Sequence, residues 1–487
     1  MASRLPAVRS LAAQLQTRRI RGTRVSDAAA FLAAHRGELE LFEDVEHLAL
    51  STDPEYATAD TTTELMKTSR AMAHHLGVVR SSLAEALWSR EIFVDAQILD
   101  EVVFWAARNP RHPNVVIGAL ETIRDARINR PGLLIFPLHS LGFAGFGVIP
   151  PAHRKLAIIN PDAGYALTPQ TNSMESTMDF LEGVANAFGA RKSVPRDLIV
   201  HWRKSRSTTW LERNPLLALR TIQMPGSYYG NQAFLLARVK ATTALICMLS
   251  TLQQSTSHEG ELFSTRLFNN WQTLDIHHYI TLFDTPARRE KLEGYCVPIH
   301  DGLREVAELS ALDLDLDPRH ARQSKNGVRA HAAVEELFTY YLQDRVLRKR
   351  ETVRTRTVTK FFNALSFYRR SFQRGTGDWR AKVALSTAFE MLLTDSYGGV
   401  TATLERRTRL VLKGIPGVTA MASAVSAMYV ARSSVVHTGT DIDADLALAR
   451  RAFALSFVEL VERLPHLSTR STTPIADLTD HYSAPGY

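Results

Sequence analysis

Cysteine is nearly absent from this chain of 487 residues, which contains only Cys247 and Cys296. Two cysteines cannot form the disulfide framework of a small secreted domain, and these two lie too far apart for the close pair of a zinc finger. The sequence also lacks an uninterrupted run of about 20 apolar residues, and the uncharged stretch 132–151 contains prolines and glycines throughout. We therefore expect no membrane span and a cytoplasmic location in a reducing cytosol.

Common catalytic and cofactor motifs are missing as well. The sequence contains no GxSxG, HExxH or paired-carboxylate signature, and GFAGFG at 142–147 lacks the Lys-Ser/Thr and the spacing that hold phosphates. Asp313, Asp315 and Asp317 alternate as on one face of a strand and could hold a cation, or they form a solvated loop before a proline. We predict no cofactor and no metal.

Positive charge is in excess and unevenly distributed. The chain carries 58 Lys+Arg against 50 Asp+Glu, a formal net charge of +8, and 47 of the 58 basic residues are arginine. Segment 353–413 contains 12 basic and 4 acidic residues, 12 − 4 = +8, which equals the excess of the whole chain. Codon bias can also enrich arginine, but a concentrated basic patch predicts RNA binding, and we assign it to Arg406, Arg407, Arg409 and Lys413.

The texture of the sequence changes along the chain and predicts a mainly α fold. Apolar residues at helical spacing dominate, except where short apolar runs separated by Gly, Pro and Asn indicate strands. The predicted organisation is a helical region 1–130, a small α/β segment 131–230, a helical region 231–350, a helical bundle 351–466 and a loose tail 467–487.

The first 26 residues contain six arginines and no acidic residue. Such a segment is typical of a mitochondrial transit peptide. The alternative, which we favour, is a basic first helix, because Leu5, Val8, Leu11 and Leu15 repeat near the helical period.

The spacing Arg-x4-His occurs three times, at Arg70/His75, Arg196/His201 and Arg432/His437. Chance alone predicts about 1.6 copies in a chain of this composition (47 × 17 / 487). Context separates them: the first pair lies in the middle of a predicted helix and the second in a predicted strand. The third lies at the end of a predicted helix, 418–436, whose apolar face includes Met428 and Tyr429 and which Gly439 terminates.

This context resembles the HEPN superfamily (higher eukaryotes and prokaryotes nucleotide-binding domains), in particular its larger bacterial defence-type members. The resemblance covers roughly residues 355–464, where we expect helices at 357–372, 378–397, 401–413, 418–436 and 444–464. The first of these should bury an aromatic face that contains Phe361, Phe362, Tyr368 and Phe372. It implies a helical bundle with an Arg-x4–6-His motif late in a long helix, and Glu390 matches the acidic position of the second helix. Ser433 follows the arginine, where active members often have Asn, Asp or His.

The chemistry of Arg432 and His437 suits RNA cleavage by the 2′-hydroxyl. Imidazole can move protons at neutral pH, and a guanidinium fork can bind phosphoryl oxygens. Five residues of ideal helix separate the two side chains by about 140°, so we expect the helix to unwind near His437 or a dimer to combine two motifs. Glu390 would orient the side chain of Arg432 or of His437. In the alternative, Arg432 pairs with Glu390 and His437 caps the helix.

The hypothesis from sequence is a metal-independent HEPN-type endoribonuclease, homodimeric through the C-terminal bundle. The resemblance implies bacterial antiviral defence or a toxin role, and a trigger ligand or protein would act through residues 1–350. The alternative is a non-catalytic RNA- or nucleotide-binding interaction protein that uses the bundle only to dimerise.

Overall fold

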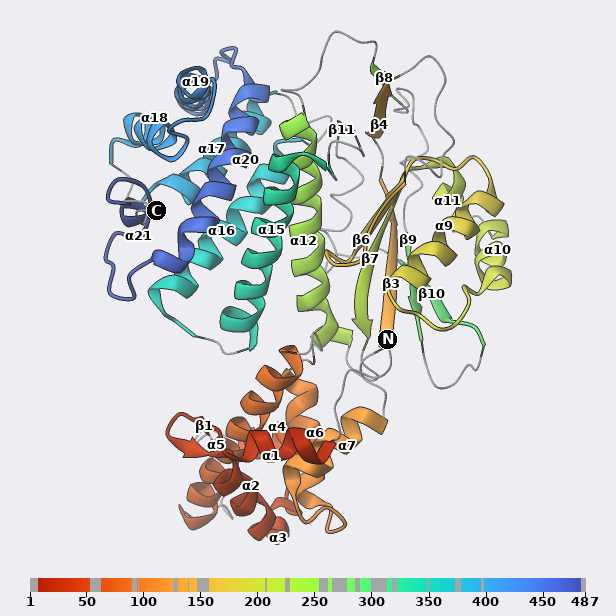
Figure 1. Ribbon diagram of the computed structural model, residues 1–487. Coiled ribbons are helices and arrows are strands. Elements are labelled where there is room, and N and C mark those ends of the chain that lie inside the picture. The colour runs from red at the N-terminus through yellow and green to blue at the C-terminus, as the bar shows by residue number, and fades with distance from the viewer. Residues whose placement is uncertain are drawn as a thin grey trace.

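The computed structural model describes residues 8–52, 63–89, 94, 96–125, 130–138, 140–146, 157–205, 208–223, 228–253, 262–264, 278–284, 290–298, 313–317, 321, 323–347, 350–372, 378–395 and 398–482. Within these residues the fold is mainly α, as predicted, with a small sheet region. Figure 1 shows an N-terminal helical cluster, a sheet flanked by helices, and a C-terminal helical bundle.

The N-terminal cluster contains α1 (Val8–Gln16), α2 (Val25–Ala34), α3 (Arg36–Leu39), α4 (Val45–Leu50), α5 (Thr63–Trp88), α6 (Ala96–Arg108), α7 (Val115–Asp125) and the hairpin β1 (Arg19–Ile20)–β2 (Thr23–Arg24). The predicted amphipathic first helix is α1, which buries Val8, Leu11 and Leu15; Leu5 lies outside the described residues. In the hairpin, Arg21 and Gly22 form a two-residue turn, and both have positive φ.

The main sheet has six antiparallel strands in the order β10-β9-β3-β7-β6-β5. The strands are β3 (Arg130–Pro137), β5 (Ile158–Asn160), β6 (Tyr165–Thr168), β7 (Leu216–Gln223), β9 (His278–Phe283) and β10 (Glu293–Pro298). Successive side chains of β3 point to opposite faces. Leu133 and Ile135 therefore join the core beneath α9 (Met174–Ala187), whereas Leu134 and Phe136 join the larger core that contains α12 (Tyr228–Gln253).

Two predictions in this region are wrong. The sheet extends beyond 131–230, because β9, β10 and the smaller sheet β11 (Asp313–Leu316)–β4 (Ser140–Phe146)–β8 (Leu262–Ser264) draw strands from the region expected to be helical. The run DLIVHW, predicted as a strand, lies in helix α10 (Arg196–Lys204), which packs beside α11 (Trp210–Arg213) in Figure 1. Short apolar runs do not distinguish a strand from a half-buried helix.

Helix α12 is the central element of the larger core. Its segment 234–253 is long and apolar enough to cross a membrane, but 83% of an apolar 18-residue stretch within it is buried inside the protein. It packs against α15 (Lys325–Tyr340), which continues into the π-helical segment η5 (Tyr341–Leu347), and against the C-terminal bundle. Its apolar character is therefore accounted for by its place in the core.

The C-terminal bundle contains α16 (Val353–Arg370), α17 (Asp378–Leu393), α18 (Val400–Val411), α19 (Val418–Thr438) and α20 (Leu446–Arg463), followed by a 3₁₀ turn (Leu464–His466) and α21 (Pro474–Thr479). The aromatic face predicted for the first helix is buried, with Phe361, Phe362 and Tyr368 at or below 1% exposure. Because α12 and α15 pack on α16 and α20, the bundle shares one continuous core with the preceding helices.

The segment predicted as a loose tail is largely ordered. Helix α21 buries Ile475 and Leu478 against the bundle. The carboxylate of Asp395 accepts hydrogen bonds from the backbone N–H of Ile475 at 2.8 Å and of Ala476 at 2.9 Å. Because two N–H groups at its start are satisfied and its apolar residues are buried, α21 is a fixed part of the fold. Residues 483–487 of the predicted tail lie outside the described residues.

Candidate functional site

Helix α19 carries the Arg432/His437 pair close to its C-terminal end. The helix remains regular through Thr438 and ends at Gly439, whose φ is 70° and whose N–H donates to the carbonyl of Val435 at 3.1 Å. The unwinding expected near His437 is therefore absent. Within one copy, Arg432 and His437 stay about 140° apart around the helix axis.

Arg432 is half-buried beside Tyr429, one helical turn before it. Its guanidinium carbon lies 5.5 Å from the centroid of the Tyr429 ring, within the range of a cation–π contact. In the described part of the chain, its Nε–H is buried without a hydrogen-bond partner, and no carboxylate lies within ion-pair distance of 4.0 Å. Buried polar groups are generally hydrogen-bonded. Among the described residues, the Nε–H groups of Arg354 and Arg451 are also buried without a hydrogen-bond partner, so Arg432 differs mainly in its place beside His437 on α19.

Glu390 of α17 contacts Tyr429 and not Arg432. The Tyr429 hydroxyl donates to Glu390 Oε1 at 2.6 Å. Burial, and then the hydrogen bond and the negative charge of Glu390, raise the pKa of Tyr429 to about 12, so the phenol is protonated and acts as a donor at neutral pH. The alternative in which Arg432 pairs directly with Glu390 is therefore not what this structure contains.

Tyr429 is the residue that the sequence analysis missed at this site. It was assigned to the apolar core face of the helix, and its ring is indeed half-buried. Its position three residues before Arg432 places the two side chains on neighbouring positions of the same helix surface. That spacing was the available signal, since a tyrosine beside an arginine can hold the guanidinium in place.

His437 is exposed at the end of α19, and the loop after it is anchored. Lys382, which is 2% exposed, donates from Nζ to Asp441 Oδ1 at 2.5 Å and to the Ile442 carbonyl at 2.7 Å. No hydrogen bond of the His437 ring was found to the described residues, and Gly439 closes the helix. The histidine therefore faces solvent next to a fixed loop, which does not support the helix-capping alternative.

The basic residues of α18 are mostly engaged within the chain. Arg406 forms a bidentate pair with Asp480, with nitrogen–oxygen distances of 2.7 and 2.9 Å. Arg407 is buried and bonds to Asp480, Asp395 and the Leu393 carbonyl.

The two remaining basic residues, one in α18 and one just after its end, differ. Arg409 pairs with Glu405 at 2.8 Å, whereas exposed Lys413 has no ion pair in the described part of the chain. Because Arg407 is buried and bonded within the chain, it stabilises the fold and cannot present its guanidinium to RNA, contrary to the prediction from sequence. Arg406, Arg409 and Lys413 remain at the surface.

The other two Arg-x4-His pairs lie outside the bundle. Arg70 and His75 lie in the middle of α5, as predicted, and Arg196 and His201 are exposed on α10. Groups of three or more metal-binding side chains were sought among the described residues and none was found. Asp313 and Asp315 lie in β11, and Asp317 directly follows it. The segment is therefore a strand, and the solvated loop, which the sequence favoured, is wrong for its first four residues.

Comparisons with known proteins give no match: no family model, no curated protein and no solved structure matches the chain.

Proposed function

We propose that the chain is a HEPN-type, metal-independent endoribonuclease that acts in the cytoplasm, and that Arg432 and His437 carry the chemistry. The observation that supports this most is the state of Arg432, which is half-buried, positioned by Tyr429 and unpaired with any carboxylate of the described residues. A guanidinium held in this way remains available for a phosphate. The resemblance to bacterial defence and toxin ribonucleases supplies the biological setting.

The reaction needs two proton transfers and one anion-binding group. The 2′-hydroxyl loses its proton to a base and attacks phosphorus, the P–O5′ bond breaks, and the leaving oxygen takes up a proton. The products are a 2′,3′-cyclic phosphate and a free 5′-hydroxyl. His437 supplies the imidazole that moves protons, and Arg432 binds the phosphoryl oxygens as charge develops on them. Glu390 acts indirectly, because it holds the Tyr429 hydroxyl.

The geometry of α19 favours a site that two copies complete. Since the helix stays regular, one copy holds Arg432 and His437 on different faces. A stripe with coiled-coil spacing follows the outer face of α19 and consists of the exposed residues Ser423, Ala427, Val430 and His437 and the half-buried Ser434. Val430 is 51% exposed. A second chain packed along this stripe would bring two copies of His437 to one surface.

The test is cleavage of total RNA by purified protein in the presence of EDTA. The His437→Ala variant should lose cleavage by about 10²–10⁴-fold while it still binds RNA, because the imidazole moves protons and adds little affinity. Arg432→Lys keeps the charge but loses the fork, and it should also cleave poorly. Both residues are partly exposed, so each variant should melt within a few degrees of wild type.

The pair on α10 provides a matched control with the same spacing. His201→Ala removes an exposed helical histidine that also lies five residues after an arginine, and it should leave cleavage unchanged. Equal loss of activity in His201→Ala and His437→Ala, or wild-type activity in His437→Ala, would reject the assignment.

The second candidate function is RNA or nucleotide binding without cleavage. The uninterrupted helix through Thr438 and Ser433 after the arginine both favour it. In that case wild type binds RNA in EDTA but leaves it intact, whatever its oligomeric state.

A further inference from the structure

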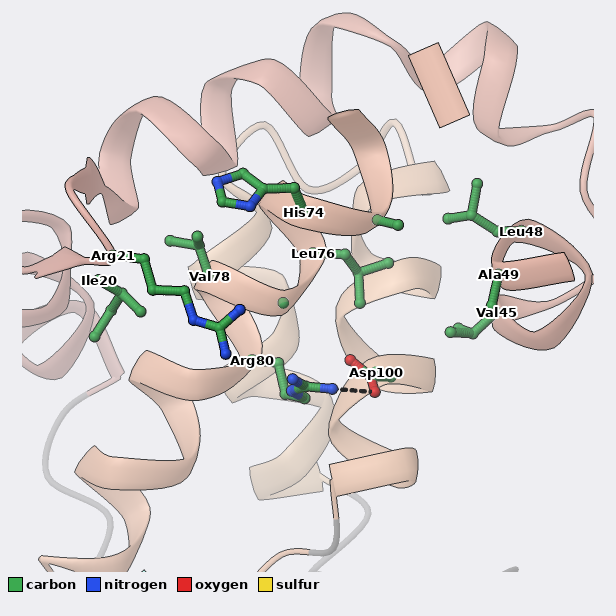
Figure 2. A pocket seen from close by; sticks show the side chains of 12 residues that line it. Ile20, Arg21, Val45, Leu48, Ala49, His74, Leu76, Val78, Arg80 and Asp100 are labelled. Atoms are coloured by element: carbon green, nitrogen blue, oxygen red, sulfur yellow. Dashed lines mark hydrogen bonds and ion pairs between the residues drawn. The ribbon is translucent and has the colours of Figure 1, made fainter. Parts of the chain in front are cut away.

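The N-terminal cluster contains a cavity that the proposed ribonuclease site does not use. It has a volume of about 240 Å³ and lies between the β1–β2 hairpin, α4, α5 and α6 (Figure 2). Its apolar wall includes Val45, Leu48 and Leu76, and its polar groups are Arg21, His74, Arg80 and Asp100. A small apolar cavity with a few convergent polar groups is the usual form of a ligand site.

Arg21 has a left-handed backbone conformation, which is unfavourable for a residue with a long side chain. Its φ is 51°, and among the described residues only one other non-glycine, Asn172, has a positive φ. A two-residue hairpin turn of this kind normally takes Asn, Asp or Gly, because a bulky side chain is strained there. The strained residue also lines the cavity, and such strain is typical of functional positions.

Gly77 is a second residue at the cavity whose identity is unfavourable for the stability of its own helix. It lies in the middle of α5, where glycine is destabilising relative to alanine. A Cβ at this position would meet only Arg80 Nη2, at 3.8 Å, which is an ordinary contact. Packing therefore does not exclude a side chain here. Gly77 keeps open the space above the helix that forms part of the cavity wall.

The charges around the cavity leave one positive charge in excess. Arg80 pairs with Asp100 at 2.8 Å, but no ion pair engages Arg21 in the described part of the chain. Figure 2 shows Arg21 at one side of the cavity, Leu48 and Val45 at the other, and Arg80 with Asp100 between them. One excess guanidinium beside an apolar wall is complementary to a monoanion with an apolar body.

We propose that this cavity binds a small organic carboxylate, with its carboxylate against Arg21 and Arg80 and its apolar part against α4 and α5. A cavity of about 150 Å³ can bind benzene, so a cavity of about 240 Å³ has room for a ligand of about ten non-hydrogen atoms. This proposal concerns the N-terminal cluster and holds whether or not the C-terminal site cleaves RNA.

The test uses calorimetric titration of the full-length protein with three ligands of similar size. They are 3-phenylpropanoate, its uncharged amide 3-phenylpropanamide, and phenyl phosphate. We expect saturable 1:1 binding of the carboxylate with Kd below about 1 mM, and binding of the amide weaker by about tenfold or more. No saturable binding of the carboxylate at about 10 mM, or equal binding of the amide, overturns the proposal. Tighter binding of phenyl phosphate than of the carboxylate overturns the assignment of the ligand class.

Two variants distinguish the cavity from general attraction by a basic protein. Arg21→Gly removes the guanidinium and suits the positive φ, so it should weaken binding by about tenfold or more while the melting temperature stays equal or rises. Gly77→Leu fills the cavity with a good helix former and should abolish binding in a folded protein. The matched control is Arg19→Ala, an exposed arginine of the same hairpin that does not line the cavity. Equal loss in Arg19→Ala and Arg21→Gly, or full binding by Gly77→Leu, places the ligand elsewhere and overturns the proposal.

Discussion

Asp480 links the C-terminal segment to the bundle, and its removal should loosen both. It accepts two hydrogen bonds from Arg406 and two from Arg407, with distances of 2.7 to 3.1 Å. The Arg406 side chain is 53% exposed, so its pair contributes at most about 1 kcal/mol. The Arg407 side chain is only 8% exposed, and breaking a buried pair costs about 3–5 kcal/mol.

Arg407 would not lose every partner in Asp480→Ala. Its Nη1 still donates to the Leu393 carbonyl at 2.7 Å and lies 3.3 Å from Asp395. We therefore reduce the expected loss to about 2–4 kcal/mol of local opening free energy. Hydrogen exchange measures this directly, since opening can be followed in α18 and α21 with α5 as an internal reference.

The exposed partner supplies the control for this prediction. Arg406→Ala removes the same carboxylate contact from the solvent side and should change exchange in α21 by about 1 kcal/mol or less. A loss below about 1 kcal/mol in Asp480→Ala, or an equal loss in Arg406→Ala, would refute the structural role assigned to buried Arg407. Asp480→Ala also frees Arg406 from its only carboxylate partner among the described residues. The affinity of the protein for RNA at low salt should therefore rise in this variant.

Three further results are expected. Tyr429→Phe leaves half-buried Glu390 without its hydroxyl donor and should lower stability by about 1.5–3 kcal/mol, measured by urea titration, with a smaller effect on cleavage than His437→Ala. Lys382→Met frees the loop 439–445 and should accelerate its hydrogen exchange, whereas unchanged exchange there would show that the loop is held by other contacts. Burial lowers the pKa of His331 below 6.5, so the unfolded chain binds the proton first. Stability should fall as pH drops from about 6.5 toward the lower folded-state pKa, and His331→Gln should flatten this decline in a series of melting curves.

Helical periodicity was sufficient to predict those elements whose apolar residues follow a regular spacing. The first helix and the aromatic face of α16 are found where the sequence placed them. The prediction of a strand at the run in α10 is wrong, because only Ile199 of that helix is fully buried. Its apolar pattern is too short to distinguish the two-residue period of a strand from the 3.6-residue period of a helix.

The sequence suggests the residues of the proposed site, but it does not predict the contacts that they make. A spacing of three residues could have associated Tyr429 with Arg432, because it is local to one helix. The bond from Tyr429 to Glu390 depends on how α17 and α19 pack, and the bonds of Arg407 depend on Asp480, which lies 73 residues away. Net charge over a segment therefore overestimated the basic surface, because the neutralising carboxylates come from other parts of the chain.

The burial of α12 determines which fragment of this protein can fold alone. A fragment that begins at α16 would expose to water the faces of α16 and α20 that α12 and α15 cover in the intact chain. Exposed apolar patches of that kind favour aggregation. The smallest autonomous unit for expression, crystallisation or transfer to another protein should therefore begin upstream of Tyr228 and extend through α21, because the central helix belongs to the bundle in packing although it precedes it in sequence.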